Sequence, residues 1–427
     1  MPILLKNATY INWQTLRFSN CNILADENNT LLKFPEDLKQ LNPAITVIDC
    51  SGKLVTKSFG VGHHHVYSAL SRGMGAPKKT PANFSEILKY IWWTLDKCLD
   101  EKMIEASALA TAIECARAGS TFVIDHHASP FAVKGSLGII ADAFDRVGVS
   151  HLLCYEISDR DKVSIAKEGL EETERYLKCR QGLVGLHASF TIGEHTLRSA
   201  ADLMKRYNSG VHIHVAEDRY DQDMTIKKYG NRVVKRLEQA GVLSSGKTIL
   251  AHCLHLDEEE KDIIRNSGCS VVQNCDSNLN NNVGYFNGRN LGNKIMLGTD
   301  GMHSDMLQSA RSAFFVGQRY DNIDFSSAYK RFRQVHHYLN DNGFKGDGEN
   351  NLVVLNYNPP TPVNEENFLG HFIFGINSNH ISDVISDGRL IVRDRRIITV
   401  DENAVMTEAR EQAKRLWSRM AKADFYK

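Results

Sequence analysis

Histidine and acidic residues recur in this 427-residue chain at the ends of short apolar segments. Neutral imidazoles and carboxylates are ligands that suit a borderline divalent cation such as zinc. A further carboxylate beside such a cation can carry protons during hydrolysis. The residue types therefore predict a metal-dependent hydrolytic site, and the candidates are His63, His65, His214, Glu217, His252 and Asp300.

Each of these signals is weak when it is taken alone. His63 and His65 lie two residues apart, so an extended chain would point both to the same side. However, a chain with 17 histidines would contain roughly one such pair by chance. His252 could be a hydrogen-bonded core residue, and Asp300 could be an ordinary helix cap. We favour a metal site because all of these candidates fall at the ends of predicted strands.

The apolar segments predict eight buried parallel strands separated by amphipathic helices. This alternation is typical of a (β/α)8 TIM-like barrel, in which catalytic groups lie at the carboxyl ends of the strands. The candidates fall at the ends of predicted strands one, five, six and eight. The expected strands are Leu54–Thr56 leading to His63, Thr121–Asp125, His151–Tyr155, Leu183–His187, Val211–Val215, Thr248–His252, Ser270–Gln273 and Ile295–Thr299. The helices expected between them include Glu101–Arg117, Leu137–Val147, Thr196–Tyr207, Asp223–Ala240 and Asp257–Asn266.

The two ends of the chain contain short strands broken by turn residues. We expect residues 1–56 and 348–401 to pair into one small β-sandwich domain beside a barrel formed by residues 57–347. Residues 402–427 contain a final amphipathic helix.

Composition excludes several classes of function. The chain has 51 basic and 51 acidic side chains, so it has no electrostatic footprint for nucleic acid or for an anionic membrane surface. No apolar run is long enough to span a bilayer, and the N-terminus does not resemble a signal peptide. The nine cysteines form no Cys-x-x-Cys pair, which argues against a disulfide framework. We expect a cytoplasmic enzyme.

One motif favours a different function. Residues 241–248, Gly-Val-Leu-Ser-Ser-Gly-Lys-Thr, match the pattern of a phosphate-binding loop. That loop must follow a strand and begin a helix, so that the helix N-terminus faces the phosphates. Here a predicted helix runs into Gly241 and a strand begins at Thr248. We interpret Gly241 as a helix C-cap.

Several longer motifs resemble those of the amidohydrolase superfamily. The resemblance covers nearly the whole chain and is strongest to the cyclic-deaminase and chlorohydrolase branch, in particular to the SsnA-type aminohydrolases. The segments that carry it are His63–Gly73, Val123–Pro130, Gly185–Phe190, His212–Asp218, Ala251–His255, Gly298–Met302 and Asn358–Pro362.

This resemblance implies roles for individual residues. The metal ligands would be His63, His65, His214 and Asp300, and Asp300 would also take part in catalysis. Glu217 would be the proton shuttle, and His252 would orient or stabilise the reacting centre. Strand four has no lysine where binuclear relatives carry a bridging one, so we expect one divalent ion, Zn²⁺ or else Fe²⁺. The substrate-binding candidates are His187, Ser277, Asn278 and His303.

The expected function is an aminohydrolase that uses a metal-activated water to release ammonia from an amino-substituted purine, pteridine or triazine. The alternatives are a hydrolase with the same site that expels chloride, an alkylamine or an amide nitrogen, and a non-catalytic barrel scaffold. The resemblance also implies a homo-oligomer. The roles of His126 and His127 stay open, and we expect Trp92 and Trp93 to serve helix packing.

Overall fold

Eight parallel strands form the centre of the computed structural model, which describes residues 2–27 and 45–426. Nearly every residue in these strands is buried, as expected of strands that are covered on both faces. Their bounds are β5 Phe59–His64, β6 Ser120–His127, β7 Ser150–Tyr155, β8 Val184–Ala188, β9 Val211–Val215, β10 Ile249–His252, β11 Ser270–Gln273 and β12 Ile295–Leu297.

The eight strands form two parallel sheets, β5-β6-β7 and β8-β9-β10-β11-β12. Backbone contacts join these sheets at both edges. Between β7 and β8, Leu183 N–H donates to the Leu153 carbonyl (3.0 Å). Between β12 and β5, Thr299 N–H donates to the His63 carbonyl (3.0 Å) and His64 forms a bridge with Asp300.

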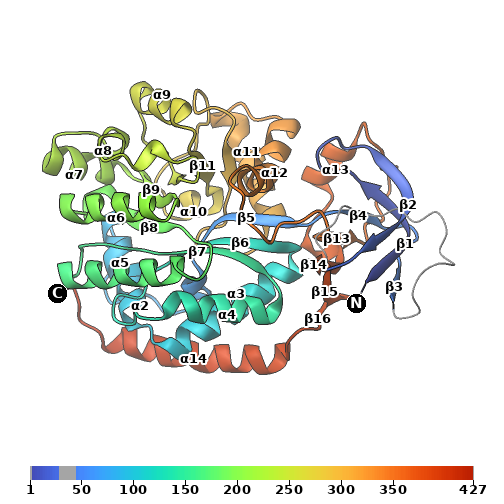
Figure 1. Cartoon of the computed structure of the whole chain (residues 1–427), viewed down its shortest axis with the longest axis horizontal. Helices are drawn as coiled ribbons and strands as arrows, with labels where there is room; N and C mark the ends of the chain where they lie inside the picture. Colours follow the sequence, from blue (N-terminus) through green and yellow to red (C-terminus); the bar gives the residue numbers. More distant parts are fainter. Residues whose placement is uncertain (1, 28–44, 427) are drawn as a thin grey trace.

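Helices follow most of these strands and pack around them (Figure 1). Helix α4 shows why: Leu137, Ile140, Ala141 and Phe144 lie on one face, and all four are buried. The surrounding helices are α3 Glu101–Arg117, α4 Ser136–Val147, α5 Val163–Leu177, α6 Glu194–Arg206, α7 Arg219–Tyr229, α8 Val233–Gln239, α9 Glu258–Ser267, α11 Met306–Tyr320 and α12 Phe325–Asp341.

The prediction of one helix over Asp223–Ala240 is wrong. The structure has two helices there, α7 and α8. Gly230 lies between them with φ 73°, and its N–H closes the last turn of α7 by donating to the carbonyl of Ile226. Glycine adopts this left-handed conformation at little cost, so the helix ends at this point.

Short helices lie in the connections that follow the strands. The longest such connection links β5 to α3, and it includes a π-helical turn, η3. The bounds are η2 Val66–Ser71, α1 Phe84–Ile87, η3 Leu88–Trp92, α2 Trp93–Cys98, η4 Ser189–Thr191, η5 Val242–Ser244 and α10 Cys275–Asn280.

The two chain ends meet in one mixed sheet, to the right of the parallel strands in Figure 1. Strands β4 and β13 pair antiparallel and so join the N-terminal strands to the C-terminal ones. The expectation that Leu54–Thr56 leads the first parallel strand is therefore wrong, because these residues lie in β4 of this sheet. Its strands are β1 Ile3–Ile11, β2 Phe18–Ala25, β3 Thr46–Asp49, β4 Leu54–Lys57, β13 Leu352–Leu355, β14 Ile381–Ser386, β15 Arg389–Arg393 and β16 Arg396–Ile397.

The remaining helices connect this sheet to the rest of the molecule. Helix α13 (Phe368–Phe374) packs against α11 and α12, and η6 (Ser378–His380) precedes β14. Helix α14 (Glu402–Lys422) runs back from the mixed sheet along α3 and α2 (Figure 1).

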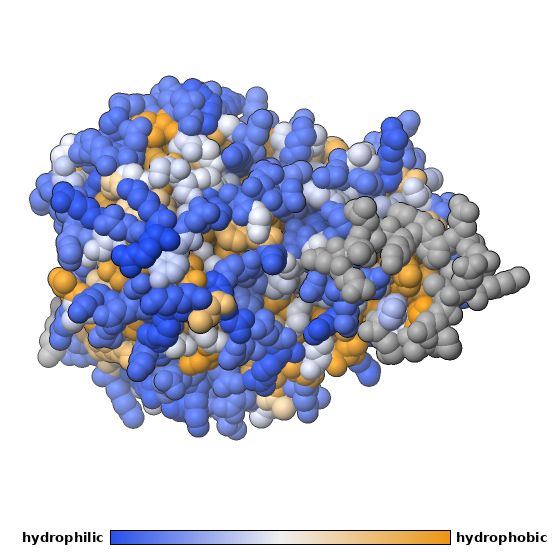
Figure 2. All heavy atoms as spheres, viewed as in Figure 1, coloured by the Kyte–Doolittle hydropathy of each residue, from blue (hydrophilic) through white to orange (hydrophobic). Residues whose placement is uncertain are grey.

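The face shown in Figure 2 is mostly hydrophilic, and the loop at Gly241 connects a helix to a strand. Hydrophilic residues cover most of the face in Figure 2, with small apolar areas between them. None of the described helices is long and apolar enough to cross a membrane. Gly241 has φ 75° after α8, and β10 begins at Ile249. The order is helix, loop, strand, which is the reverse of a phosphate-binding loop.

We predict that Gly185→Ala lowers the free energy of unfolding by about 1–3 kcal/mol, because overpacking strains a tight interior. A Cβ at Gly185 in β8 would lie 2.2 Å from the backbone oxygen of Tyr155 in β7. The control is Gly138→Ala in α4, where a Cβ would meet nothing within 4 Å. The control should gain about 0.5–1 kcal/mol because alanine favours helix. Urea unfolding measures both variants, and equal stability of the two would contradict the close approach of β7 and β8.

Candidate active site

The candidate residues lie at the carboxyl ends of β5, β9, β10 and β12. His63 lies in β5 and His65 directly follows it, while His214 lies in β9. His252 ends β10, and Asp300 follows β12. Parallel strands bring their carboxyl ends to one rim, so residues far apart in sequence become neighbours.

Several residues at this rim adopt a left-handed backbone conformation. Ala216, His252 and Asp300 adopt positive φ angles of 46°, 73° and 52°. Residues other than glycine rarely adopt this conformation, and it persists only where the surrounding structure enforces it. The left-handed backbone turns the chain sharply after each strand and directs the neighbouring side chains to the rim.

The four predicted ligands fall into overlapping groups of possible metal-binding residues: His63, His65 and Asp300 form one, and His63 and His214 form another with His252. His65 Nε2 lies 3.1 Å from His214 Nε2 and 3.1 Å from Asp300 Oδ1. His63 Nε2 lies 3.6 Å from the same carboxylate oxygen. Ligands at about 2.0–2.2 Å from a tetrahedral zinc are about 3.3 Å apart. All four side chains are buried, and their residue types suit a divalent cation such as zinc.

The opposite ring nitrogens explain why these Nε2 atoms are free to bind a cation. His65 Nδ1–H donates to the carbonyl of His126 (2.6 Å), and His214 Nδ1–H donates to the carbonyl of His187 (2.8 Å). A carbonyl can only accept, so these contacts fix the tautomer, as is usual for metal-binding histidines. His63 Nε2 is buried and has no hydrogen-bond partner among the described residues. Such an orphaned lone pair is typical of a ligand position.

The pKa values of these groups reflect their burial. Burial lowers the pKa of His63 to about 3 and holds that of His214 well below its ordinary value, so both are neutral. Burial also opposes a charge on His65, but the contact with Asp300 outweighs it and raises the pKa of His65 to about 9. Without a metal, His65 therefore carries a proton on Nε2 at neutral pH, and this proton must leave before a cation can bind there.

A second cluster overlaps the first. His126 and Glu156 lie close enough to His65 and His214 to form an alternative group of ligands. However, Glu156 Oε1 accepts a hydrogen bond from Arg160 (2.8 Å), which already places a positive charge beside this carboxylate. We therefore favour the set that includes Asp300.

Glu217 and His252 lie beside the candidate ligands. His252 Nε2 is 3.6 Å from Glu217 Oε2 and 3.6 Å from Asp300 Oδ2. The amide nitrogen of Asn278 donates to His252 Nδ1 (2.8 Å), so a neutral His252 carries its proton on Nε2, toward the two carboxylates. Burial, together with the charge of Asp300, holds the pKa of Glu217 well above its ordinary value. Glu217 can therefore hold a proton near neutral pH.

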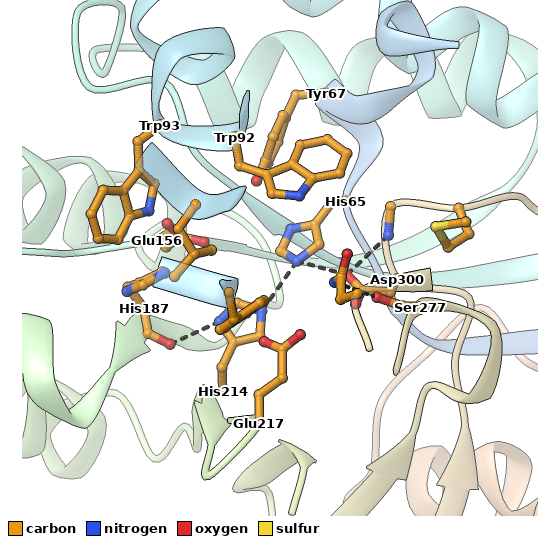
Figure 3. Close-up of a pocket in the computed structure, with 15 residues that line it drawn as sticks. His65, Tyr67, Trp92, Trp93, Glu156, His187, His214, Glu217, Ser277 and Asp300 are labelled. Carbon is orange, nitrogen blue, oxygen red and sulfur yellow. Dashed lines mark hydrogen bonds and ion pairs between the residues drawn. The ribbon is translucent and has the colours of Figure 1, made fainter. Parts of the chain in front are cut away.

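A cavity opens over these residues, and its wall is aromatic (Figure 3). The π-helical turn η3 and the start of α2 place Leu88, Trp92 and Trp93 along it. Both tryptophans also pack in a hydrophobic cluster with Leu88 and Phe190, so their place in the cavity wall adds to the expected packing role. Periodicity could not reveal this, because the π-turn brings residues four and five positions apart to the same side.

The predicted substrate-binding residues fall into two groups. His187 and Ser277 line the cavity, together with Glu217 and Asp300. Asn278 contacts His252 instead. His303 lies outside this cavity, where its Nε2 pairs with Asp276 Oδ2 (3.2 Å).

Sequence reasoning missed three polar residues that line the cavity: Tyr67, Glu156 and Asn281. Glu156 follows β7 directly, and an acidic residue after an apolar strand is the same signal that identified Asp300. The sequence left the roles of His126 and His127 undecided. Both are buried, and they are the last two residues of β6. His126 Nε2 contacts the carbonyls of Leu186 and His212, and its Nδ1 lies 3.2 Å from Glu156 Oε2.

Comparison with curated proteins finds deaminases that align along most of this chain. A 5'-deoxyadenosine deaminase of Methanocaldococcus jannaschii is 27% identical over 407 residues, which cover 90% of this chain and 94% of that protein. A 5-methylthioadenosine/S-adenosylhomocysteine deaminase of Syntrophomonas wolfei is 25% identical over 404 residues, which cover 87% and 88% of the two chains.

A solved structure shows the fold of this chain, and a family model shows its family. The structure of an adenosine deaminase from Xanthomonas campestris with bound zinc superposes with a TM-score of 0.82 at 17% identity, covering 97% of this chain and 98% of that one. This likeness shows a TIM-barrel fold of the α/β class. Residues 62–331 match the model of the Amidohydrolase family. Because this match covers well over half of the sequence, the chain belongs to the amidohydrolase family.

Proposed function

We propose that this protein is a metal-dependent aminohydrolase that releases ammonia from an amino-substituted nitrogen heterocycle. The observation that carries the proposal is Glu217, a carboxyl group with a raised pKa and a side chain only 13% exposed, which lines one cavity with His65, His214 and Asp300. The deaminase names of the aligned relatives support the same reaction class.

Family membership and the donor set indicate a divalent metal. We propose that His63, His65, His214 and Asp300 hold it and that it is Zn²⁺, which suits imidazole and carboxylate donors at these spacings. When bound, such an ion lowers the pKa of a water molecule toward about 7 and so supplies a nucleophile at neutral pH.

In this proposal the residues around the metal site have different roles in the reaction. Asp300 accepts a proton from the attacking water through Oδ2, the oxygen nearer His252. Glu217 delivers a proton to the ring nitrogen next to the attacked carbon, which neutralises charge as it develops. Asp300 then passes its proton to the amino group, the C–N bond breaks and ammonia leaves. The proton of the new hydroxyl returns to Glu217 as the carbonyl forms. The Nε2–H group of His252 donates a hydrogen bond to the reacting centre, while Asn278 keeps this imidazole in position. Trp92 and Leu88 pack on the ring of the substrate.

We also propose that the barrel is closed and that the chain divides into the domains expected from the sequence. The contacts at both edges of the two parallel sheets support a closed (β/α)8 barrel over residues 57–347. Buried apolar residues from β1, β2, β3, β4, β13 and β14 support a small β-sandwich built from residues 1–56 and 348–401. We propose residues 402–427 as the last segment of the same division; helix α14 covers Glu402–Lys422 of it, and residues 1, 28–44 and 427 of the division lie outside the described residues. The homo-oligomer stays a prediction.

The reaction class is tested by an ammonia-release screen over amino-substituted purines, pteridines and triazines with the zinc-loaded enzyme. We expect turnover on at least one of these compounds and none after chelation. A zinc-loaded enzyme that releases chloride or an alkylamine from analogues, but no ammonia, would instead support the alternative leaving groups.

We predict that Glu217→Gln keeps the metal but lowers kcat by about 10²–10⁴-fold, because the amide cannot transfer a proton. Metal content and kcat are measured on the same preparations. The matched control is Glu259→Gln, which changes an exposed glutamate that lies 3.8 Å from Lys235 on the outer surface. A kcat near the wild-type value in Glu217→Gln would refute the shuttle role.

We predict that removal of the metal abolishes activity and lowers Tm, and that a stoichiometric amount of Zn²⁺ restores both. A ligand that binds only the folded state stabilises it by mass action. In the double variant His63→Ala/His65→Ala, added Zn²⁺ should no longer raise Tm. If Zn²⁺ shifts Tm of this variant as it does that of the wild type, the proposed ligand set is wrong.

A further inference from the structure

Glu156 is a buried carboxylate in the cavity wall that the proposed reaction does not use. It directly follows β7, and its side chain is only 3% exposed. Its Oε1 accepts a hydrogen bond from Arg160 (2.8 Å), and its Oε2 lies 3.2 Å from His126 Nδ1. An ionised carboxylate offers about four acceptor positions, so acceptor capacity remains for a molecule in the cavity.

The surroundings of Glu156 keep it charged. Arg160 also pairs with Asp96 and lies 3.5 Å from Asp161, which in turn pairs with Lys97 (2.6 Å). Burial raises the pKa of Asp96 to about 7, so Arg160 and Lys97 chiefly balance Glu156 and Asp161, and His126 contacts the other oxygen of Glu156. A hydrogen-bond donor on the substrate would use the acceptor positions that these contacts leave on Glu156.

His187 supplies a second acceptor on the same wall. The hydroxyl of Thr191 donates to the carbonyl of Ala188 (2.9 Å), so it accepts from His187 Nδ1–H (2.8 Å). This leaves the lone pair on Nε2. A neutral imidazole with its proton on Nδ1 presents Nε2 as an acceptor.

The fold places these two acceptors together and away from the reacting centre. Ile157, next to Glu156, forms a bridge with Leu186, next to His187. In Figure 3 both side chains lie on the side of Trp93, whereas Asp300 and Ser277 lie on the opposite side of the cavity. Trp93 backs this wall, with its ring 5.7 Å from that of His187.

We propose that Glu156 and His187 form an acceptor pair that binds a hydrogen-bond-donor edge of the substrate, the edge opposite the leaving amino group. This inference rests on the proposed function and assigns a specificity-determining role to Glu156. The ligand chemistry is N–H or O–H donation, from the imidazole N–H of a free purine base or from the hydroxyls of a pentose. Substrates with a carboxylate or phosphate at this edge are rejected, because like charges repel in a buried site.

The test measures binding separately from turnover. Calorimetric titration of zinc-loaded Glu217→Gln and Glu217→Gln/Glu156→Gln uses adenine, guanine, their 9-methyl derivatives and adenosine as probes. A hydrogen bond to a charged group contributes about 1.5–3 kcal/mol, so Glu156→Gln should weaken binding of donor-bearing probes by about 10–100-fold. Binding of the 9-methyl bases should hardly change. Comparison of the affinities for adenine and adenosine shows whether the bound donor is the N–H of the base or a hydroxyl of the pentose.

Three controls keep the result specific. Glu105→Gln changes an exposed glutamate, paired with Arg146 on the surface, and should not affect binding. Zinc content and Tm of each variant show whether folding is intact. Glu156→Asp, which keeps the charge, should recover part of the affinity for donor-bearing probes.

Three outcomes would overturn the proposal: equal loss of affinity for all probes, no loss for any, or no binding of any probe by the Glu217→Gln parent. Selective loss in the calorimeter without ammonia release by the wild-type enzyme would instead leave the acceptor pair standing and refute the proposed reaction. The acceptor pair and the proposed reaction can therefore be refuted independently of each other.

Discussion

The structure depends on the burial of several imidazoles and carboxylates around one point at the strand ends. His63 and His214 are held neutral by burial, while Asp300 stays ionised because His63 and His65 contact it and hold its pKa well below the ordinary value, against the effect of burial. Such a cluster is unfavourable unless a positive charge balances it. A cation at this point therefore satisfies both the electrostatics of the fold and the chemistry of hydrolysis.

The same residues join the fold to the site. Backbone hydrogen bonds between β5 and the segment after β12 involve His63, His65 and Asp300, whose side chains are three of the four proposed ligands. The ligand geometry is therefore set by the backbone contacts that connect the first and last strands. Strain at His252 and Asp300 is tolerated because strand pairing and buried contacts on every side oppose relaxation.

Around this centre the cavity has two chemically different walls. Glu217, His252 and Asp300 provide groups that exchange protons or stabilise charge. Glu156 and His187 provide acceptors that are fixed by their own partners, Arg160 and Thr191. Two carboxylates of similar burial can thus take different roles, because Arg160 contacts Glu156 whereas Glu217 faces the negative charge of Asp300.

Much of the central fold could be predicted from local pattern. Continuous apolar runs marked β9 and β11 at their observed bounds, and amphipathic spacing marked α3. The break between α7 and α8 was missed because the spacing of apolar residues does not show that Gly230 adopts a left-handed backbone conformation. Leu54–Thr56 was placed in the wrong sheet, since an apolar strand carries no information about its partner.

The sequence by itself determined which residues could be ligands, because strand ends and residue types are local properties. It did not determine their spacing, the direction of each imidazole proton or the aromatic wall. His252 acquires its orientation from Asn278, 26 positions away, and Trp92 reaches the cavity through a π-helical turn. Glu156 acquires its place from the pairing of β7 with its neighbours. Only the tertiary structure decided these features, because each depends on contacts between segments that are distant in the chain.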